Sequence, residues 1–161
     1  MDEAIIRAAQ DDDSGGLIRM IDAIYCEFSG CVLDVDNEAP ELRAPASAAA
    51  ADNGQWWVVE RRGEIVGSVA LVPGEGGSAE LRKLYVAAQA RRNGLGARLV
   101  RVAEDEARSQ GAASIMLWSD TRFADAHRLY ERLGFVRATR MRALGDISNS
   151  VEYHFSKDIL P

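Results

Sequence analysis

The chain has 161 residues, of which 47% are hydrophobic and 27% charged, a balance typical of one globular domain with a buried core. No apolar run reaches the roughly 20 residues that a membrane-spanning helix needs, and the first residues lack the apolar stretch of a secretory leader, so we expect no membrane partner and a cytoplasmic location. The net charge of −6 argues against a nucleic-acid partner, and two cysteines are too few for a zinc framework or a disulfide scaffold.

Apolar spacing and turn residues predict the secondary structure in chain order. The expected elements are a strand at 3–9, a helix carrying the apolar residues from Leu17 to Phe28, a loop at 31–38, a weak helix within 40–51, strands at 55–60, 65–72 and 79–86, a helix over 94–110, a strand at 114–119, a helix over 124–133, and strands near 135–141 and 151–155. This order predicts a single domain over 1–161, in which a mixed sheet carries helices on its faces.

The two halves of the chain differ in charge. Residues 1–60 hold 13 acidic and 3 basic residues, a net charge of −10, whereas residues 61–161 hold 12 acidic and 16 basic residues, a net charge of +4. Two faces of opposite sign could bind two partners of opposite sign. The alternative is that solvated helix faces simply differ in composition.

A glycine-rich turn, Arg91-Arg92-Asn93-Gly94-Leu95-Gly96-Ala97, lies between the strand at 79–86 and the helix over 94–110. The first N–H groups of a helix have no partner within it, and the helix dipole makes that end positive. Glycines allow a ligand to approach the backbone closely, so this turn predicts a phosphate site. A dinucleotide fingerprint would need glycine where Leu99 stands, and a P-loop would need Gly-Lys-Ser/Thr, which is absent.

Three features in order make the chain resemble the GNAT N-acetyltransferase superfamily. The turn at 91–96 resembles that family's acetyl-CoA motif, Leu84-Tyr85-Val86 resembles its bulged strand that contacts pantetheine, and the segment 126–135 resembles its A-x-x-L-Y-E-x-x-G-F signature. The resemblance implies an α/β (α+β) fold with a central mixed, mostly antiparallel, twisted sheet of six or seven strands and about four flanking helices. It also implies that acetyl-CoA is the cosubstrate.

Site residues can be carried over from the resemblance position by position. The residues expected to bind the cofactor are Leu84, Tyr85, Val86, Arg91, Arg92, Asn93, Gly94, Leu95, Gly96, Ala97, Asp120 and Tyr130. Many members carry an asparagine seven residues before the signature tyrosine. Here Phe123 occupies that position, which puts one pantetheine contact in doubt and leaves Ser119 or Asp120 to replace it.

Two residues are expected to be catalytic. Glu80 lies eleven residues before Arg91, the offset of the family's strand glutamate, and is the candidate base that removes the amine proton through a water. The alternative is a rim glutamate paired with Arg82. Tyr130 is the candidate acid, because a phenol can protonate a leaving thiolate, and N–H groups near Leu84–Val86 are the candidate oxyanion donors.

The acidic half is expected to face the acceptor. Asp34, Asp36 and Glu38 are the candidate substrate-binding residues and would attract a cationic amine, either a small molecule or a peptide. A solvated acidic loop is the alternative.

The remaining expectations concern groups outside this acidic loop. His127 and His154 are expected on the surface, with no catalytic role. No cluster has metal-ligand spacing, so no metal is expected. A homodimer through the late strands is possible. The alternatives to a small-molecule N-acetyltransferase are a protein lysine or N-terminal acetyltransferase and a non-catalytic acyl-CoA sensor.

Overall fold

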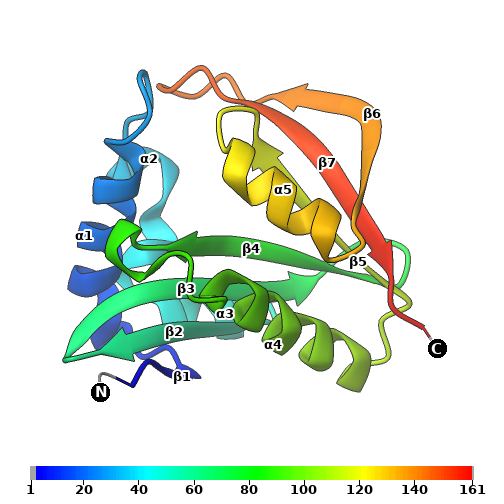
Figure 1. The fold of residues 1–161 in the computed structure, drawn as a ribbon, viewed down its shortest axis with the longest axis horizontal. Coiled ribbons are helices and arrows are strands. Elements are labelled where there is room, and N and C mark those ends of the chain that lie inside the picture. The colour runs from blue at the N-terminus through cyan, green and yellow to red at the C-terminus, as the bar shows by residue number, and fades with distance from the viewer. Residues whose placement is uncertain (1–2, 161) are drawn as a thin grey trace.

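One mixed sheet organises the chain in the computed structural model, which describes residues 3–160 (Figure 1). The strands lie in the order β1-β2-β3-β4-β5-β7-β6, and every neighbouring pair is antiparallel except β4 and β5. Their bounds are β1 Ile5–Ala8, β2 Gln55–Arg61, β3 Glu64–Pro73, β4 Ser78–Val86, β5 Ser114–Asp120, β6 Val136–Ala143 and β7 Val151–Asp158. The expected mixed, mostly antiparallel sheet of six or seven strands is confirmed.

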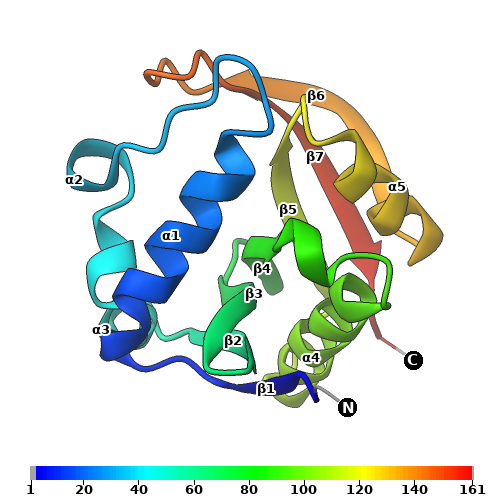
Figure 2. The same ribbon diagram turned by 60° about the vertical axis from the view of Figure 1, so that its left-hand side comes forward.

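Helices cover both faces of this sheet (Figure 2). The α-helices are α1 Ser14–Tyr25, α2 Val35–Glu38, α3 Pro45–Ala51, α4 Leu95–Ser109 and α5 Ala124–Arg132, and short 3-10 turns lie at Asp11–Asp13, Pro40–Arg43 and Ala88–Ala90. The first three helices lie on one face, and α4 and α5 lie on the other. The described residues thus hold five α-helices, close to the expected four.

The segment 31–51 differs from the prediction. We expected a loop and then one weak helix, but α2, a 3-10 turn and α3 follow one another. Asp34 caps α2, because its carboxylate accepts the backbone N–H of Asn37. Pro45 lacks an N–H and therefore starts α3 instead of interrupting a longer helix.

One part of the core lies between α4 and the central strands, and another includes Leu17 and Ile21 of α1. Leu99, Val100 and Ala103 of α4 are fully buried, as are Val59 of β2 and Val69 of β3. Burying a valine or leucine side chain stabilises a fold by about 1.5–3 kcal/mol, so this face anchors α4 to the sheet. The anchored helix fixes the position of the turn that precedes it.

Strands β4 and β5 separate after a short parallel pairing. Their ladder joins only Ser78–Glu80 to Ser114–Met116. Beyond these residues the strands diverge, as Figure 1 shows. The carboxyl ends of β4 and β5 are therefore not paired with each other, and side chains from both faces of the sheet can border the opening between them.

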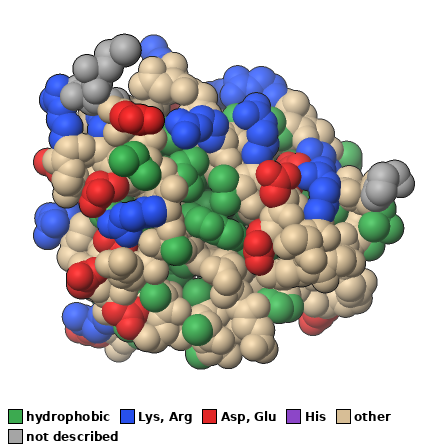
Figure 3. Space-filling model, turned by 90° about the horizontal axis from the view of Figure 1, so that it is seen from below, with side chains coloured by type: hydrophobic (Ala, Val, Ile, Leu, Met, Phe, Trp, Pro, Cys, Tyr) green, Lys and Arg blue, Asp and Glu red, His purple; other side chains and the backbone are tan. Residues whose placement is uncertain are grey.

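Charged side chains of both signs lie together on one face of the molecule (Figure 3). On the face seen from below the view of Figure 1, acidic and basic side chains intermingle around a hydrophobic centre (Figure 3).

Candidate active site

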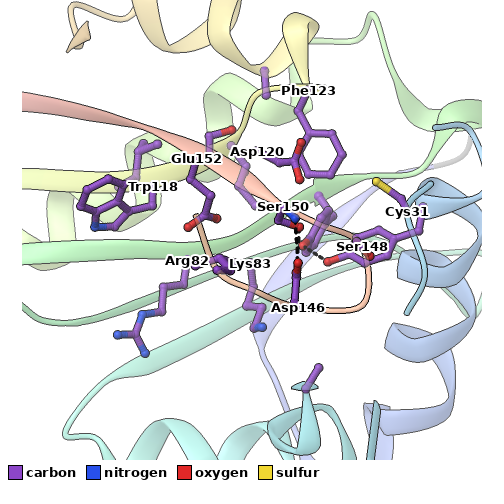
Figure 4. Close-up of a pocket in the computed structure, with 18 of the residues that line it drawn as sticks. Cys31, Arg82, Lys83, Trp118, Asp120, Phe123, Asp146, Ser148, Ser150 and Glu152 are labelled. Atoms are coloured by element: carbon purple, nitrogen blue, oxygen red, sulfur yellow. Dashed lines mark hydrogen bonds between the residues drawn. The ribbon is translucent and has the colours of Figure 1, made fainter. Parts of the chain in front are cut away.

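A cavity of about 370 Å³ lies at the opening between β4 and β5. It is bordered by the end of α1, the segment that follows it, both separated strands, α5 and the β6–β7 hairpin (Figure 4). Its lining residues include Tyr25, Asp34, Glu38, Glu80, Arg82, Lys83, Tyr85, Trp118, Asp120, Phe123, Tyr130, Arg142, Asp146 and Glu152.

A bulge in β4 forms one wall of the cavity. Ala70 of β3 lies opposite Arg82 and Ser68 lies opposite Tyr85, so one residue of β3 faces two of β4. Lys83 adopts a positive φ of 56° at this point. A bulge takes backbone groups out of the ladder. The structure thus contains an irregularity in β4 at Lys83 and Leu84, where the resemblance implied a bulge.

The glycine turn leads into α4 as the sequence predicted. Gly94 is the N-cap with φ of 73°, a left-handed conformation that favours glycine. Asn93 and Arg92 are exposed, Leu95 is buried, and Ala97 is partly buried. The N–H groups of the first turn of α4 are therefore available to an anion.

Gly96 allows α4 and α5 to pack closely beside this turn. A Cβ at Gly96 would lie 2.9 Å from Cδ2 of Leu129, so the end of the Leu129 side chain would have to shift to make room for it. The absence of a side chain at Gly96 therefore lets the end of the Leu129 side chain of α5 lie close to the backbone of α4.

Arg91 is held by other groups of the protein. Its Nη1 and Nη2 lie 2.6 and 2.8 Å from the carboxylate oxygens of Glu27, and its Nε donates to the carbonyl of Val86 at 3.0 Å. The Arg91 side chain can bind a phosphate, as the sequence predicted, only if its ion pair with Glu27 breaks. The partner is 64 residues distant in sequence, and no local pattern indicated it.

Tyr130 lines the cavity and is 4% exposed. Its ring packs against Phe135 and Phe155, with centroids 5.7 and 5.4 Å away. Burial raises its pKa well above the ordinary value of 10. At neutral pH Tyr130 is therefore a neutral phenol that can donate a hydrogen bond or a proton.

Glu80 lines the cavity, as expected of a base. It also forms an ion pair with Arg82, as expected of the alternative, a rim glutamate. Arg82 donates from Nε to Oε2 at 2.7 Å and from Nη2 to Oε1 at 3.3 Å. The Glu80 side chain keeps 19% of its surface exposed. A water could therefore still reach this carboxylate from the cavity.

Asp120, at the end of β5, is tied to Arg122. Burial raises the pKa of Asp120, but hydrogen bonds and the charge of Arg122 outweigh it and hold the pKa below the ordinary value. Phe123 packs against Phe28 with ring centroids 4.9 Å apart, so the position of the family's asparagine holds an apolar contact here.

The expected acceptor residues do not all face the cavity. Asp34 and Glu38 line it, whereas Asp36 is not among its lining residues and pairs with Arg43. The side chain of Asp36 is 74% exposed. The structure therefore brings two of the three acidic residues to the cavity wall.

Both histidines are buried, contrary to the expectation of surface positions. His127 shares a hydrogen bond with Oγ of Ser119 at 3.1 Å and is 7% exposed. His154 packs edge-on against Trp118 and is 6% exposed. Burial is the main cause that lowers the pKa of each, so both are neutral at pH 7.

Sequence reasoning missed Glu152, which points into the cavity from β7 (Figure 4). The alternation along β7 placed Glu152 on the opposite face from Val151 and Tyr153. Nothing in that alternation showed that this face borders the opening between β4 and β5.

Within residues 3–160, no group of three or more histidine, cysteine or acidic side chains is placed to hold a metal ion. Across the same residues, no helix is long and apolar enough to cross a membrane.

Curated relatives of the chain are acetyltransferases. IAA acetyltransferase of Azospirillum brasilense is 28% identical over 137 residues, covering 84% of this chain and 78% of the relative. The uncharacterised N-acetyltransferase YjgM of Escherichia coli K12 is 36% identical over 83 residues, and this match spans half the length of each protein.

Solved structures share the fold. An acetyltransferase of the GNAT family from Staphylococcus aureus Mu50 superposes with a TM-score of 0.84 at 18% identity, covering 98% of this chain and all of that one. A putative acetyltransferase of Salmonella typhimurium, solved with its cofactor acetyl-CoA, gives a TM-score of 0.72 at 19% identity, with coverage of 98% and 94%. The model of the acetyltransferase (GNAT) family matches residues 18–135, so the chain belongs to the GNAT family of acetyltransferases.

Proposed function

We propose that the chain transfers the acetyl group of acetyl-CoA to the primary amine of a small cationic molecule, by direct attack within a ternary complex. Membership of the family makes the chain an acyltransferase whose family chemistry is acetyl-CoA-dependent N-acetylation. The observation that carries the finer proposal is the acidic cavity at the β4–β5 opening, bordered by both the β4 bulge and Tyr130.

The residues at the mouth of α4 fit the diphosphate of coenzyme A. A left-handed Gly94 opens a helix whose first N–H groups have no partner within the helix. We assign diphosphate binding to the backbone of Asn93–Ala97, with exposed Arg92 beside it, and pantetheine binding to the backbone of Leu84–Val86 and to Asp120. Bound here, acetyl-CoA supplies an activated acyl group.

The chain's own groups supply the proton transfers. Because an alkylamine has a pKa of about 10.4, it is protonated at pH 7 and must lose a proton before it can attack. We assign this step to Glu80 through a water, oxyanion binding to N–H groups of the β4 bulge, and protonation of the leaving thiolate to Tyr130. The C–N bond forms as the C–S bond breaks, and the products are an amide and a free thiol.

Charge favours a cationic acceptor. Six carboxylates line the cavity against three cationic side chains. The carboxylates are Asp34, Glu38, Glu80, Asp120, Asp146 and Glu152, and the cations are Arg82, Lys83 and Arg142. A net negative lining attracts an ammonium group and raises its local concentration.

Contacts between two loops favour a small acceptor over a protein lysine or N-terminus. Ser148 of the β6–β7 hairpin accepts the N–H of Val32 at 2.9 Å and donates to the Val32 carbonyl at 3.1 Å. In addition, the N–H of Ile147 donates to Glu38 at 2.9 Å. These bonds join the two loops at the acceptor side, whereas a peptide needs an open groove that its chain can cross.

The test is thiol release from acetyl-CoA with a panel of small amines, together with calorimetry of coenzyme A binding. We expect binding and turnover with cationic amines. Binding without turnover across a broad panel would favour the non-catalytic sensor, and no binding would overturn the proposal. Both cysteines are free thiols, consistent with the cytoplasmic location that we also propose.

A further inference from the structure

The six cavity carboxylates differ in how many of their oxygens are already bound by the protein. Four of them have both oxygens engaged by neighbouring groups. Those four are Asp34 with Asn37, Glu80 with Arg82, Asp120 with Arg122, and Asp146 with Ser150. A ligand cation would have to compete with these bonds.

Glu38 and Glu152 each have only one oxygen engaged by a residue that the structure describes. Oε2 of Glu38 accepts the N–H of Ile147, and Glu38 is an exposed residue at the rim. Oε1 of Glu152 accepts Nε of Arg142 at 2.7 Å, and the Glu152 side chain is only 16% exposed. Glu152 is therefore the more shielded of the two, and a charged contact there is less weakened by solvent.

The ion pair with Arg142 of β6 holds the Glu152 carboxylate in place. In the sheet, Glu152 lies opposite Asp120 of β5 and opposite Arg142 of β6. The guanidinium of Arg142 lies 4.3 Å from the ring centroid of Trp118, so its position is set by both the ring and the carboxylate. Figure 4 shows Glu152 beside Trp118 with its carboxylate directed into the cavity.

Glu152 and the bulge residues Lys83, Leu84 and Tyr85 line the same cavity. Burial is the main cause of the raised pKa of Tyr85, and the negative charge of Glu152 contributes to it. The hydroxyl of Tyr85 shares a hydrogen bond of 3.2 Å with that of Tyr25. The Glu152 carboxylate and the part of β4 assigned to the oxyanion therefore border the same cavity.

We propose that Glu152 binds the ammonium group of the acceptor through its free oxygen and is the residue that selects cationic over neutral acceptors. This inference rests on the proposed function and names the group that recognises its substrate. Glu80 remains the assigned base, so Glu152 governs acceptor binding and Glu80 governs turnover. A hydrogen bond to a charged group contributes about 1.5–3 kcal/mol, which corresponds to an affinity change of about 10- to 100-fold.

The direct test uses n-butylammonium as the probe and the uncharged n-butanol as its size-matched control, without acetyl-CoA. The readout is the indole N–H signal of Trp118 in an NMR titration at pH 7 and low salt. We expect the wild type to bind butylammonium, Glu152→Gln to bind it about 10- to 100-fold more weakly, and butanol to shift neither protein. Glu80→Gln should retain most of the binding.

Glu75→Gln is the matched control, because Glu75 is exposed in the β3–β4 turn and the substitution changes net charge by the same amount. Glu152→Asp keeps the charge and should restore part of the binding if Glu152→Gln is poorly folded. Equal butylammonium affinity in the wild type and Glu152→Gln would overturn the inference, as would a wild type that does not bind the probe.

Kinetics separate this inference from the proposed function. We expect Glu152→Gln to raise the KM for a cationic amine by about 10- to 100-fold with kcat within a few-fold, and to leave coenzyme A binding unchanged. Failure of the proposed function would instead appear as absent turnover in the wild type. A Glu152→Gln variant with lowered kcat and unchanged KM would contradict the binding role.

Discussion

Tyr130 owes its proton-donor chemistry to its surroundings. Because burial raises its pKa, the phenol stays protonated throughout the neutral range, and ionisation should not limit the rate below pH of about 10. Tyr130→Phe keeps the ring contacts with Phe135 and Phe155 but removes the hydroxyl. We expect kcat to fall by about 100-fold or more with little change in melting temperature. Unchanged kcat would remove Tyr130 from the reaction.

The proposed role of Gly94 in phosphate binding can be tested by substitution, with Gly63, a glycine of similar backbone conformation in another turn, as the control. Gly94 and Gly63 have φ of 73° and 75°, and an added Cβ would meet no atom within 4 Å at either position. Alanine should therefore cost each variant about 1–2 kcal/mol of unfolding free energy through backbone strain alone. Only Gly94→Ala should also weaken coenzyme A binding in calorimetry. Equal coenzyme A affinity in the two variants would contradict the phosphate site.

Residues in local motifs were the easier ones to predict. Gly94 and Tyr130 stand in short motifs attached to strong helical periodicity, and the structure places Gly94 at the N-cap of α4 and Tyr130 within α5. The ion pair of Arg91 with Glu27 and the inward direction of Glu152 depend on chain segments far apart in sequence. One sequence contains no local pattern that encodes such contacts.

For elements with clear apolar periodicity, the predicted bounds agree with the observed bounds to within a few residues. Helix α4 and strands β4 and β5 are examples. The segment 31–51 was predicted poorly, because Asp34 and Pro45 start short helices whose apolar faces are too brief to give a period. The bulge at Lys83 was anticipated only through the family resemblance, since no glycine marks it.

The contact between the α1–α2 segment and the β6–β7 hairpin should control which acceptors enter. Ser148→Ala removes two hydrogen bonds with Val32, each worth about 0.5–1.5 kcal/mol. We expect a loss of about 1–3 kcal/mol in unfolding free energy and higher kcat/KM for bulky amines relative to small ones. Urea unfolding and a size series of amines measure the two effects.

Ser109→Ala is the control for this contact. Its hydroxyl donates to the carbonyl of Glu106 at 2.8 Å near the end of α4, and it is not among the cavity lining. That variant should keep the wild-type order of acceptors. If Ser148→Ala also keeps it, the loop contact does not determine acceptor size.

For the whole molecule, the carboxylates relevant to acceptor binding are those that line the cavity, and they come from both halves of the chain. The acidic half contributes Asp34 and Glu38 to the cavity, but the other four cavity carboxylates come from the basic half. The net charge of each half therefore does not identify the residues that set the charge of the cavity, because the half with a net charge of +4 contributes most of its carboxylates.

Binding of coenzyme A should stabilise the entire fold, because the turn at α4, the opening between β4 and β5, and α5 all border the proposed site. A ligand that binds only the folded state at 100 times its Kd adds about 2.7 kcal/mol. For a chain of this size, that corresponds to a rise in melting temperature of about 5–11 °C.

Free pantetheine is the matched control ligand, since it lacks the diphosphate that the turn at 91–97 is proposed to bind. At the same concentration it should shift the melting temperature far less than coenzyme A, and Gly94→Ala should reduce the coenzyme A shift toward the pantetheine value. Equal shifts from the two ligands would show that the helix mouth does not bind the diphosphate. A melting temperature unmoved by coenzyme A would contradict the enzyme and the sensor alike, because both require the cofactor to bind.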